Sequence, residues 1–218
     1  MIRVAPVVRL DSPGWAVFTM SLKIIGGEYR SRKLEGPASE DLSTRPYLQR
    51  VKESVFNILR GWFEDARVLD LFAGVGTMGL EAVSRGAAEV VMIEQNRYLA
   101  DILERNIQTL GCADRARVRR SDALSPHALA AAPAPVDIVF VDPPYAMMTD
   151  ETSRGRVLDL VARCTTVMAE ESFLVLRSPV GPETIDLAIP TLEGPETHRY
   201  GLNMWVLLYQ PRTGEAAS

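Results

Sequence analysis

The sequence is poor in the residues that form metal sites and disulfide frameworks. Its 218 residues include two cysteines, Cys112 and Cys164, and two histidines, His127 and His198. None of them has the CxxC or HxxxH spacing of a zinc site, so we expect no bound metal. Two scattered thiols are typical of a protein from a reducing compartment, whereas small secreted domains use cysteine in pairs. We therefore expect a cytoplasmic location.

Long hydrophobic runs are also missing. No apolar stretch approaches the roughly 20 residues that span a bilayer, so no membrane partner is expected. Residues 1–19 carry Arg9, Asp11 and Pro13, which interrupt any signal-peptide core. We interpret residues 1–19 as an extension outside the fold, with Met20 as an alternative start.

Acidic residues outnumber basic ones overall, but positive charge gathers in one segment. The net charge is −4 and the isoelectric point is near 5.3. Residues 21–60 nevertheless hold eight Lys or Arg and five acidic residues, a net +3, which leaves −7 for the rest. Phosphate contacts need only local positive charge, so this segment fits a nucleic-acid-binding arm. A solvated surface is an equally good interpretation of the charge alone.

Hydrophobic periodicity predicts an α/β fold. Residues 22–34 have the pattern of a hairpin that turns at Gly26-Gly27, and residues 47–63 that of an amphipathic helix. Strands and helices then alternate, which favours a doubly wound, mostly parallel sheet with right-handed crossovers. We expect the last strand of this sheet to be antiparallel. We expect an N-terminal hairpin and helix over residues 20–64, a catalytic domain over 65–211 and a tail over 212–218. The expected strands are 66–74, 89–95, 116–122, 136–144, 172–178 and 202–210; the expected helices are 77–87, 97–111, 125–132 and 151–168.

A glycine loop follows the first strand of this pattern. Gly74, Gly76 and Gly79 form a GxGxxG motif between a strand and a helix, and Glu94 ends the next strand. This is the context of a dinucleotide site, so a nicotinamide enzyme is one candidate. Asp70, just before the loop, would repel a pyrophosphate and attract a ligand with an ammonium group. The alternative for Asp70 is a helix-capping or turn residue.

Two further acids end strands. Asp142 opens the tetrapeptide Asp142-Pro143-Pro144-Tyr145, whose prolines cannot continue a sheet ladder. The tetrapeptide is either a strand terminator or a site at the carboxyl end of the sheet, where α/β folds bind ligands. Asp122 ends the third strand, where it is placed to accept a hydrogen bond from an adenine amino group; a turn residue is the alternative.

Together these motifs resemble a known superfamily. Asp70 with the glycine loop, Glu94, Asp122 and the Asp-Pro-Pro-Tyr tetrapeptide is similar to the class I S-adenosylmethionine-dependent methyltransferases. The tetrapeptide resembles the signature of members that methylate exocyclic nitrogens of adenine, guanine or cytosine. Such an amine is a weak nucleophile until it becomes more tetrahedral, and fixed acceptors favour that geometry. The Asp142 carboxylate and the Pro143 carbonyl supply acceptors, and Tyr145 offers a ring on which a base can stack.

The amino-terminal segment carries a narrower resemblance. "IIGGEYRSRKL" (residues 24–34) and "TRPYLQRVKESVFNIL" (residues 44–59), followed by the glycine loop, resemble the RsmD family of bacterial small-subunit rRNA (guanine-N2)-methyltransferases. The resemblance extends over residues 20–210. It implies methylation of a guanine in small-subunit rRNA, either naked or in a partly assembled particle. An adenine-N6 DNA methyltransferase and a non-catalytic RNA-binding assembly factor are the alternatives.

The resemblance implies three sets of site residues. Catalytic roles fall to Asp142, Pro143, Pro144 and Tyr145. The cofactor S-adenosylmethionine would be held by Asp70, Phe72, Gly74, Gly76, Gly79, Glu94 and Asp122. The RNA backbone would be contacted by Arg30, Arg32, Lys33, Arg45, Arg50 and Lys52.

Overall fold

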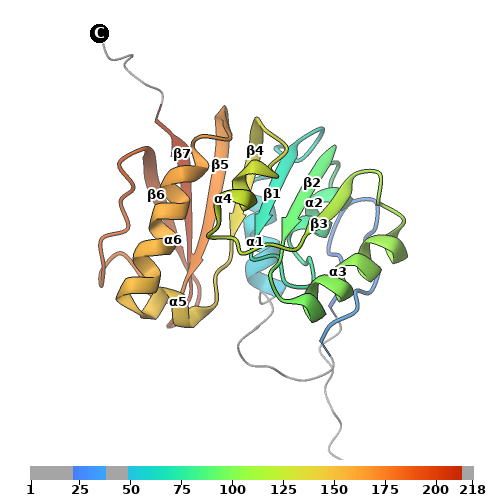
Figure 1. Ribbon diagram of the computed structural model, residues 1–218, viewed down its shortest axis with the longest axis horizontal. Coiled ribbons are helices and arrows are strands. Elements are labelled where there is room, and N and C mark those ends of the chain that lie inside the picture. The colour runs from blue at the N-terminus through green and yellow to red at the C-terminus, as the bar shows by residue number, and fades with distance from the viewer. Residues whose placement is uncertain (1–21, 38–48, 213–218) are drawn as a thin grey trace, which may run out of the picture.

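The structure, a computed structural model, describes residues 22–37 and 49–212. In these ranges the chain forms a sheet with helices on both sides (Figure 1). The strands are β1 (Arg67–Leu71), β2 (Glu89–Ile93), β3 (Ala116–Arg119), β4 (Val136–Val141), β5 (Met168–Ser178), β6 (Leu192–Arg199) and β7 (Trp205–Pro211). The helices are α1 (Gln49–Ile58), α2 (Gly79–Ser84), α3 (Arg97–Leu110), α4 (Pro126–Ala130), α5 (Tyr145–Thr149) and α6 (Glu151–Cys164).

The strand order in the sheet is β3-β2-β1-β4-β5-β7-β6. Strands β1 to β5 are parallel, whereas β7 runs antiparallel to both β5 and β6. The predicted doubly wound sheet with an antiparallel last strand is therefore confirmed. The chain leaves β1 toward β2 on one side and returns to β4 on the other. This reversal is a topological switch point, the place where such sheets bind ligands.

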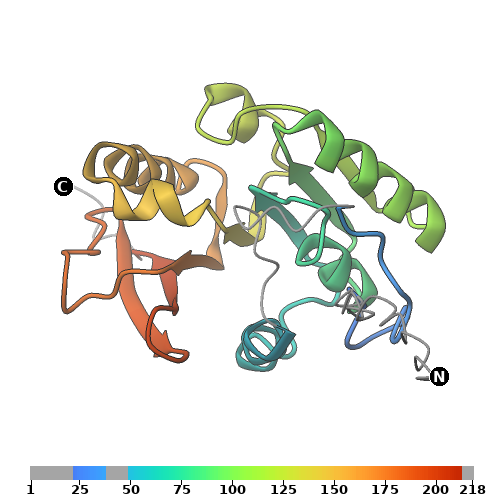
Figure 2. The ribbon, with the colours of Figure 1, turned by 90° about the horizontal axis from the view of Figure 1, so that it is seen from below.

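The sheet separates two hydrophobic cores. Because successive residues of a strand face opposite sides, Phe140 of β4 packs with Phe56 of α1, while Val139 packs with Leu160 of α6. Helices α1, α2 and α3 contribute to the first core, and α4, α5 and α6 to the second. Figure 2 shows α1 and α6 on opposite sides of the sheet.

Two elements were not predicted. Strand β6 is an edge strand with mostly exposed residues and contains Gly194-Pro195, so it lacks the apolar alternation of a half-buried strand. Helix α5 is a single short turn that begins at Tyr145, immediately after the two prolines. The predicted hairpin over residues 22–34 is reduced to a loop with one antiparallel bridge, between Lys23 and Lys33.

This N-terminal loop, residues 22–37, packs onto the sheet domain. Its Ile24 and Leu34 are buried in the first core together with residues of α1 and α2. Asn106 of α3 accepts a hydrogen bond from the Glu35 amide at 2.8 Å and donates to the Val75 carbonyl at 3.0 Å. The loop that carries the basic residues is thus joined to the glycine loop through α3. Nowhere in residues 22–37 and 49–212 is there a helix long and apolar enough to cross a membrane.

Candidate functional site

Three predicted acids meet at the switch point. Asp70 lies near the end of β1, Glu94 directly follows β2, and Asp142 directly follows β4. Because β2, β1 and β4 are parallel neighbours, their carboxyl ends share one edge of the sheet. The Asp142 amide donates to the Leu71 carbonyl at 3.3 Å, which extends the β1–β4 contact by one residue past the strand. The topology therefore brings together residues that lie up to 72 positions apart.

The glycine loop after β1 has a backbone that few residues adopt. Phe72 has φ +64°, Gly74 +56° and Gly76 +86°. A side chain at Gly76 would lie 2.2 Å from Leu103 Cδ1 and would have to adopt the left-handed φ, so packing and backbone both favour glycine there, whereas the space beside Gly74 is open. A non-glycine residue such as Phe72 in the left-handed region is strained, and such strain gathers at functional sites.

Glu94 is fixed by backbone donors. Its Oε2 accepts from the Gly74 amide at 2.8 Å and its Oε1 from the Asn96 amide at 2.7 Å, and the side chain is nearly buried. Each carboxylate oxygen has a second lone pair, so Glu94 can still accept hydrogen bonds from a ligand. Its two hydrogen bonds to backbone amides tie the glycine loop to Asn96, the residue before α3.

Asp70, in β1, is buried next to the last glycine of the loop. Its Oδ2 accepts from the Gly79 amide, the first residue of α2, at 2.9 Å, and it is 1% exposed. Burial, together with the charges of Asp142 and Glu94, raises its pKa to about 8, despite that hydrogen bond. The described contacts are those of the capping role that the sequence left open. Its contact with an ammonium group stays a prediction.

Asp122 is exposed and closes a turn. Its Oδ1 accepts from the Leu124 amide at 2.9 Å, the contact expected of an aspartate two residues before its donor in a turn. Its contact with an adenine amino group stays a prediction. The residue stands in the loop that leaves β3 and leads to α4.

The tetrapeptide forms a rigid connection between strand β4 and helix α5. Strand β4 ends at Val141, three residues before the end of the expected strand over 136–144, and α5 begins at Tyr145. Pro143 is buried, while Pro144 is exposed and its carbonyl accepts from the Met147 amide at 2.9 Å. The two prolines, with φ fixed by their rings, leave Asp142 and Tyr145 little freedom to move relative to each other.

Arg177 is a site residue that sequence reasoning missed. It is 5% exposed, its Nε donates to Asp142 Oδ1, and its guanidinium lies 5.0 Å from the centre of the Tyr145 ring. Burial raises the pKa of Asp142 to about 6, and Arg177 opposes the rise. A charge at the end of the apolar strand "SFLVLR" is the signal that could have drawn attention to Arg177.

The basic residues of the predicted RNA-binding set differ in exposure. Arg30, Arg32, Lys33 and Arg50 are exposed, and Arg32 also donates to the Thr109 carbonyl at 2.9 Å. Arg45 lies outside the described residues. Lys52 is buried, so its interpretation as a phosphate contact is not supported by its position.

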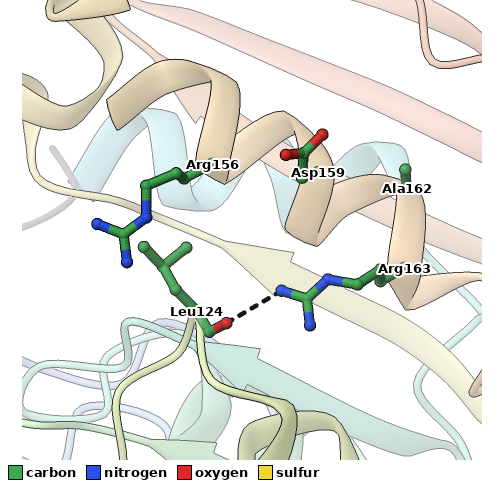
Figure 3. A pocket seen from close by; sticks show the side chains of 5 residues that line it. All are labelled: Leu124, Arg156, Asp159, Ala162 and Arg163. Carbon is green, nitrogen blue, oxygen red and sulfur yellow. Dashed lines mark hydrogen bonds between the residues drawn. The ribbon is translucent and has the colours of Figure 1, made fainter. Parts of the chain in front are cut away.

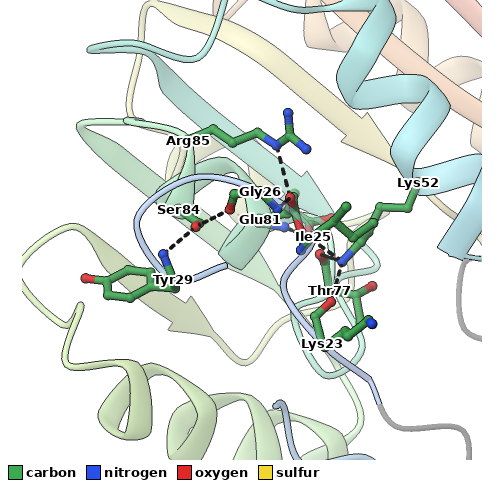
Figure 4. A network of polar contacts seen from close by, with 11 residues as sticks. Lys23, Ile25, Gly26, Tyr29, Lys52, Thr77, Glu81, Ser84 and Arg85 are labelled. Atoms are coloured by element: carbon green, nitrogen blue, oxygen red, sulfur yellow. Dashed lines mark hydrogen bonds and ion pairs between the residues drawn. The ribbon is translucent and has the colours of Figure 1, made fainter. Parts of the chain in front are cut away.

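Lys52 belongs to a buried network centred on Glu81 (Figure 4). Its Nζ lies 3.1 Å from Glu81 Oε2, and the Glu81 carboxylate also accepts from the Ile25 and Gly26 amides, each at 2.8 Å. Burial lowers the pKa of Lys52 against the opposing effect of Glu81. The pair holds α1, α2 and the N-terminal loop together, and a buried charge without its partner is costly.

A hollow of about 450 Å³ lies beside α6, on the side of the sheet that the second core covers (Figure 3). It is lined by Leu124 and by the α6 residues Arg156, Asp159, Ala162 and Arg163. Arg163 donates to the Leu124 carbonyl at 3.0 Å. None of the predicted site residues lines this hollow. In the described part of the chain, no group of three or more His, Cys, Asp or Glu is arranged to hold a metal ion.

The sheet order, the glycine loop after β1, Glu94 after β2 and the tetrapeptide after β4 define a Rossmann-like class I methyltransferase fold. The particular family follows from a family model described as "Conserved hypothetical protein 95", which matches residues 22–209. The chain belongs to this family.

Relatives agree with the assignment. "Ribosomal RNA small subunit methyltransferase D" of Escherichia coli (strain K12) is 48% identical over 124 residues, which cover 57% of this chain and 60% of that protein. "Putative rRNA methyltransferase YlbH" of Bacillus subtilis (strain 168) is 33% identical over 195 residues, 88% of this chain and 100% of that protein. The match thus spans less than two thirds of the first relative and all of the second. The resemblance to the RsmD family is confirmed.

A solved structure has the same architecture. "Putative methyltransferase yhhF from Escherichia coli" superposes with a TM-score of 0.73 and 34% sequence identity, covering 88% of this chain and 98% of that chain. The fold is therefore shared along most of the chain.

Proposed function

We propose that the protein methylates the exocyclic N2 amine of a guanine in small-subunit rRNA, with S-adenosylmethionine as methyl donor. The observation that carries the proposal is the position of Asp142. It stands at the switch point, next to the glycine loop, in a tetrapeptide suited to an exocyclic amine. The names of both relatives support ribosomal RNA as the substrate class, and that of the Escherichia coli relative supports the small subunit.

The residues present fit the donor. Gly74 has open space beside it, Glu94 presents a fixed carboxylate for ribose hydroxyls, and Asp70 supplies a carboxyl group beneath the loop. We assign the remaining cofactor contacts to Phe72, Gly76, Gly79 and Asp122. The donor supplies an electrophilic methyl group on its sulfonium sulfur.

The protein's part in the reaction is to hold the amine. The Asp142 carboxylate and the Pro143 carbonyl accept hydrogen bonds from its two N–H groups and favour the geometry that exposes the lone pair. Because the guanidinium of Arg177 lies against the Tyr145 ring, the base stacks on the opposite face of that ring. Pro144 keeps the turn stiff, so the acceptors do not drift.

The RNA is held by the exposed basic residues. We assign the phosphate contacts to the exposed Arg30, Arg32 and Lys33 on the N-terminal loop and to the exposed Arg50 at the start of α1. We assign Arg45 the same role from the sequence alone. Phosphate contacts would give affinity without sequence preference, and the pocket would select the base. A partly assembled particle in the cytoplasm would present such a substrate.

The test is a transfer assay with labelled S-adenosylmethionine. Small ribosomal subunits, free rRNA and duplex DNA are offered separately, and the modified nucleoside is identified by mass analysis. The proposal expects label in N2-methylguanine from rRNA. Label in N6-methyladenine from DNA would support the alternative methyltransferase. RNA binding without any transfer would support a non-catalytic assembly factor, and either result would overturn the proposal.

A further inference from the structure

Arg177 contacts both side chains that the proposed chemistry uses. Its Nε donates to Asp142 Oδ1, and its Nη1 lies 3.5 Å from the Tyr145 hydroxyl oxygen. The guanidinium carbon lies 5.0 Å from the centre of the Tyr145 ring. One buried cation therefore contacts the acceptor of the target amine and the ring proposed to stack on the base.

The sheet explains how a residue 35 positions away reaches the tetrapeptide. Strands β4 and β5 are parallel neighbours, with Val141 opposite Leu176 in the register. The next residues, Asp142 and Arg177, follow at the same level. On its other side β5 pairs with β7, where Val206 stands opposite Arg177. The position of Arg177 is thus fixed by two neighbouring strands and not by a loop.

We propose that Arg177 is a positioning residue for methyl transfer, which keeps Asp142 ionised and aimed and sets the plane of the Tyr145 ring. This inference rests on the proposed function. A planar guanidinium suits both tasks because it donates along fixed directions and stacks on an aromatic face. A lysine ammonium would supply charge without either fixed geometry.

Several charged or titratable groups face Asp142. Arg177 approaches from β5 and favours the ionised carboxylate. Asp70, at the end of β1, repels that carboxylate when Asp70 is itself ionised, and Tyr145, from α5, shares the guanidinium. Glu94 acts on Asp70 and so belongs to the same acidic group. Of these, Arg177 is the cation in hydrogen-bonding contact with Asp142. Without it, the partly buried carboxyl group of Asp142 would lie beside other acids and would take up a proton at higher pH.

The experiment compares Arg177→Met and Arg177→Lys with the full-length wild type. Single-turnover methyl transfer to small-subunit rRNA is measured at saturating RNA from acidic to alkaline pH, with a calorimetric titration of S-adenosylmethionine on each protein. The wild-type rate should fall on the acidic side near the Asp142 pKa of about 6. In Arg177→Met this fall should move up by about one to three pH units, the range of an arginine's effect on a neighbouring carboxyl group. Cofactor affinity should stay within about twofold.

Arg177→Lys separates charge from geometry. It should keep the pH dependence of the wild type but have a lower rate at its pH plateau, by about tenfold, because the fixed hydrogen-bond directions are absent. If Arg177→Met does not fold, this variant carries the test alone, and a plateau rate equal to wild type would then overturn the inference.

The matched control is Arg67→Met. Arg67 forms an arginine–aspartate pair with Asp137, at 3.8 Å. This pair joins the same two strands, β1 and β4, but at their amino ends, away from the candidate site. This variant should keep the wild-type rate and pH dependence. A wild type that transfers no methyl group would overturn the proposed function. An active wild type whose Arg177→Met variant keeps both rate and pH dependence would overturn only the role of Arg177.

Discussion

The two halves of the site hold their carboxylates by different means. On the side of the glycine loop, Asp70 and Glu94 accept from the backbone amides of Gly79, Gly74 and Asn96. On the side of the tetrapeptide, Asp142 is held by the side chain of Arg177. Backbone donors carry no ionic charge and do not depend on a neighbouring side chain. We call the side with Asp70 and Glu94 the proposed cofactor half and the side with Asp142 the proposed base half. The cofactor half should tolerate changes in the base half, whereas the base half depends on a single ion pair.

The largest expected effect comes from a substitution that changes the base half alone. Asp142→Asn keeps the size of the side chain but removes its charge and turns an N–H group toward the donors around it. Single-turnover transfer at saturating RNA should fall by about two orders of magnitude or more, the scale seen when a preorganised donor or acceptor to a transition state is removed. Cofactor affinity, measured by calorimetry on the same protein, should survive. A near-normal rate would mean that the prolines only end a strand.

The converse change breaks the cofactor half. Glu94→Ala removes the carboxylate that accepts from the Gly74 and Asn96 amides and that we assign to the ribose. The affinity for S-adenosylmethionine should fall by about tenfold or more, since a hydrogen bond to a charged group contributes about 1.5–3 kcal/mol. Transfer at saturating cofactor should change much less. Unchanged calorimetric affinity would remove Glu94 from the site.

The buried carboxyl group of Asp70 should make the affinity of the cofactor half for S-adenosylmethionine depend on pH. Its pKa of about 8 means that it is largely protonated at neutral pH in the free protein, and an ammonium group must be met by the ionised form. Cofactor affinity should therefore rise with pH from 6 to 8, by up to about tenfold per unit. Asp70→Asn should bind more weakly and without this slope. A wild-type affinity that is flat with pH would argue against the ammonium contact.

The smallest expected effect concerns the N-terminal loop, which lies outside both halves. Changing Arg30, Arg32 and Lys33 to Gln should weaken RNA binding and reduce the slope of its salt dependence by about 0.7–0.9 for each phosphate that is no longer neutralised. Cofactor affinity should not change. Arg67→Gln, at the opposite edge of the sheet, is the control for removal of a surface charge. If the triple variant keeps the wild-type salt slope, these residues are only solvated.

Much of the site could be predicted because its signals are local. The glycine loop, Glu94 and the tetrapeptide each lie within a few residues of a strand end, and parallel strands bring their carboxyl ends to one edge. The Asp142–Arg177 pair could not be predicted in this way, because it depends on β5 being the neighbour of β4. Sequence separation of 35 residues hides that contact. The antiparallel edge strand β6 was missed for a related reason, since its exposed residues follow no apolar pattern.

Lys52 shows where a readable signal was overlooked. In α1 and the turn after it, the buried Val55, Phe56 and Leu59 stand three, four and seven positions after Lys52, so all four residues lie on the same helical face. Periodicity therefore predicts that Lys52 points inward. The count of positive charges favours an RNA contact, but helical position is the stronger indicator because it places the Lys52 side chain in the core. What no pattern could have supplied is the partner, Glu81, in a helix that is adjacent only in the folded chain.

The separation of the two halves is tested most directly by combining Glu94→Ala with Asp142→Asn. If cofactor binding and positioning of the amine are independent, the reductions in kcat/KM for S-adenosylmethionine should multiply, to within about threefold of the product of the single variants. The combined variant should then be slower than either single one. Residues that act as one unit are strongly non-additive, so a double variant no worse than Asp142→Asn alone would contradict the account.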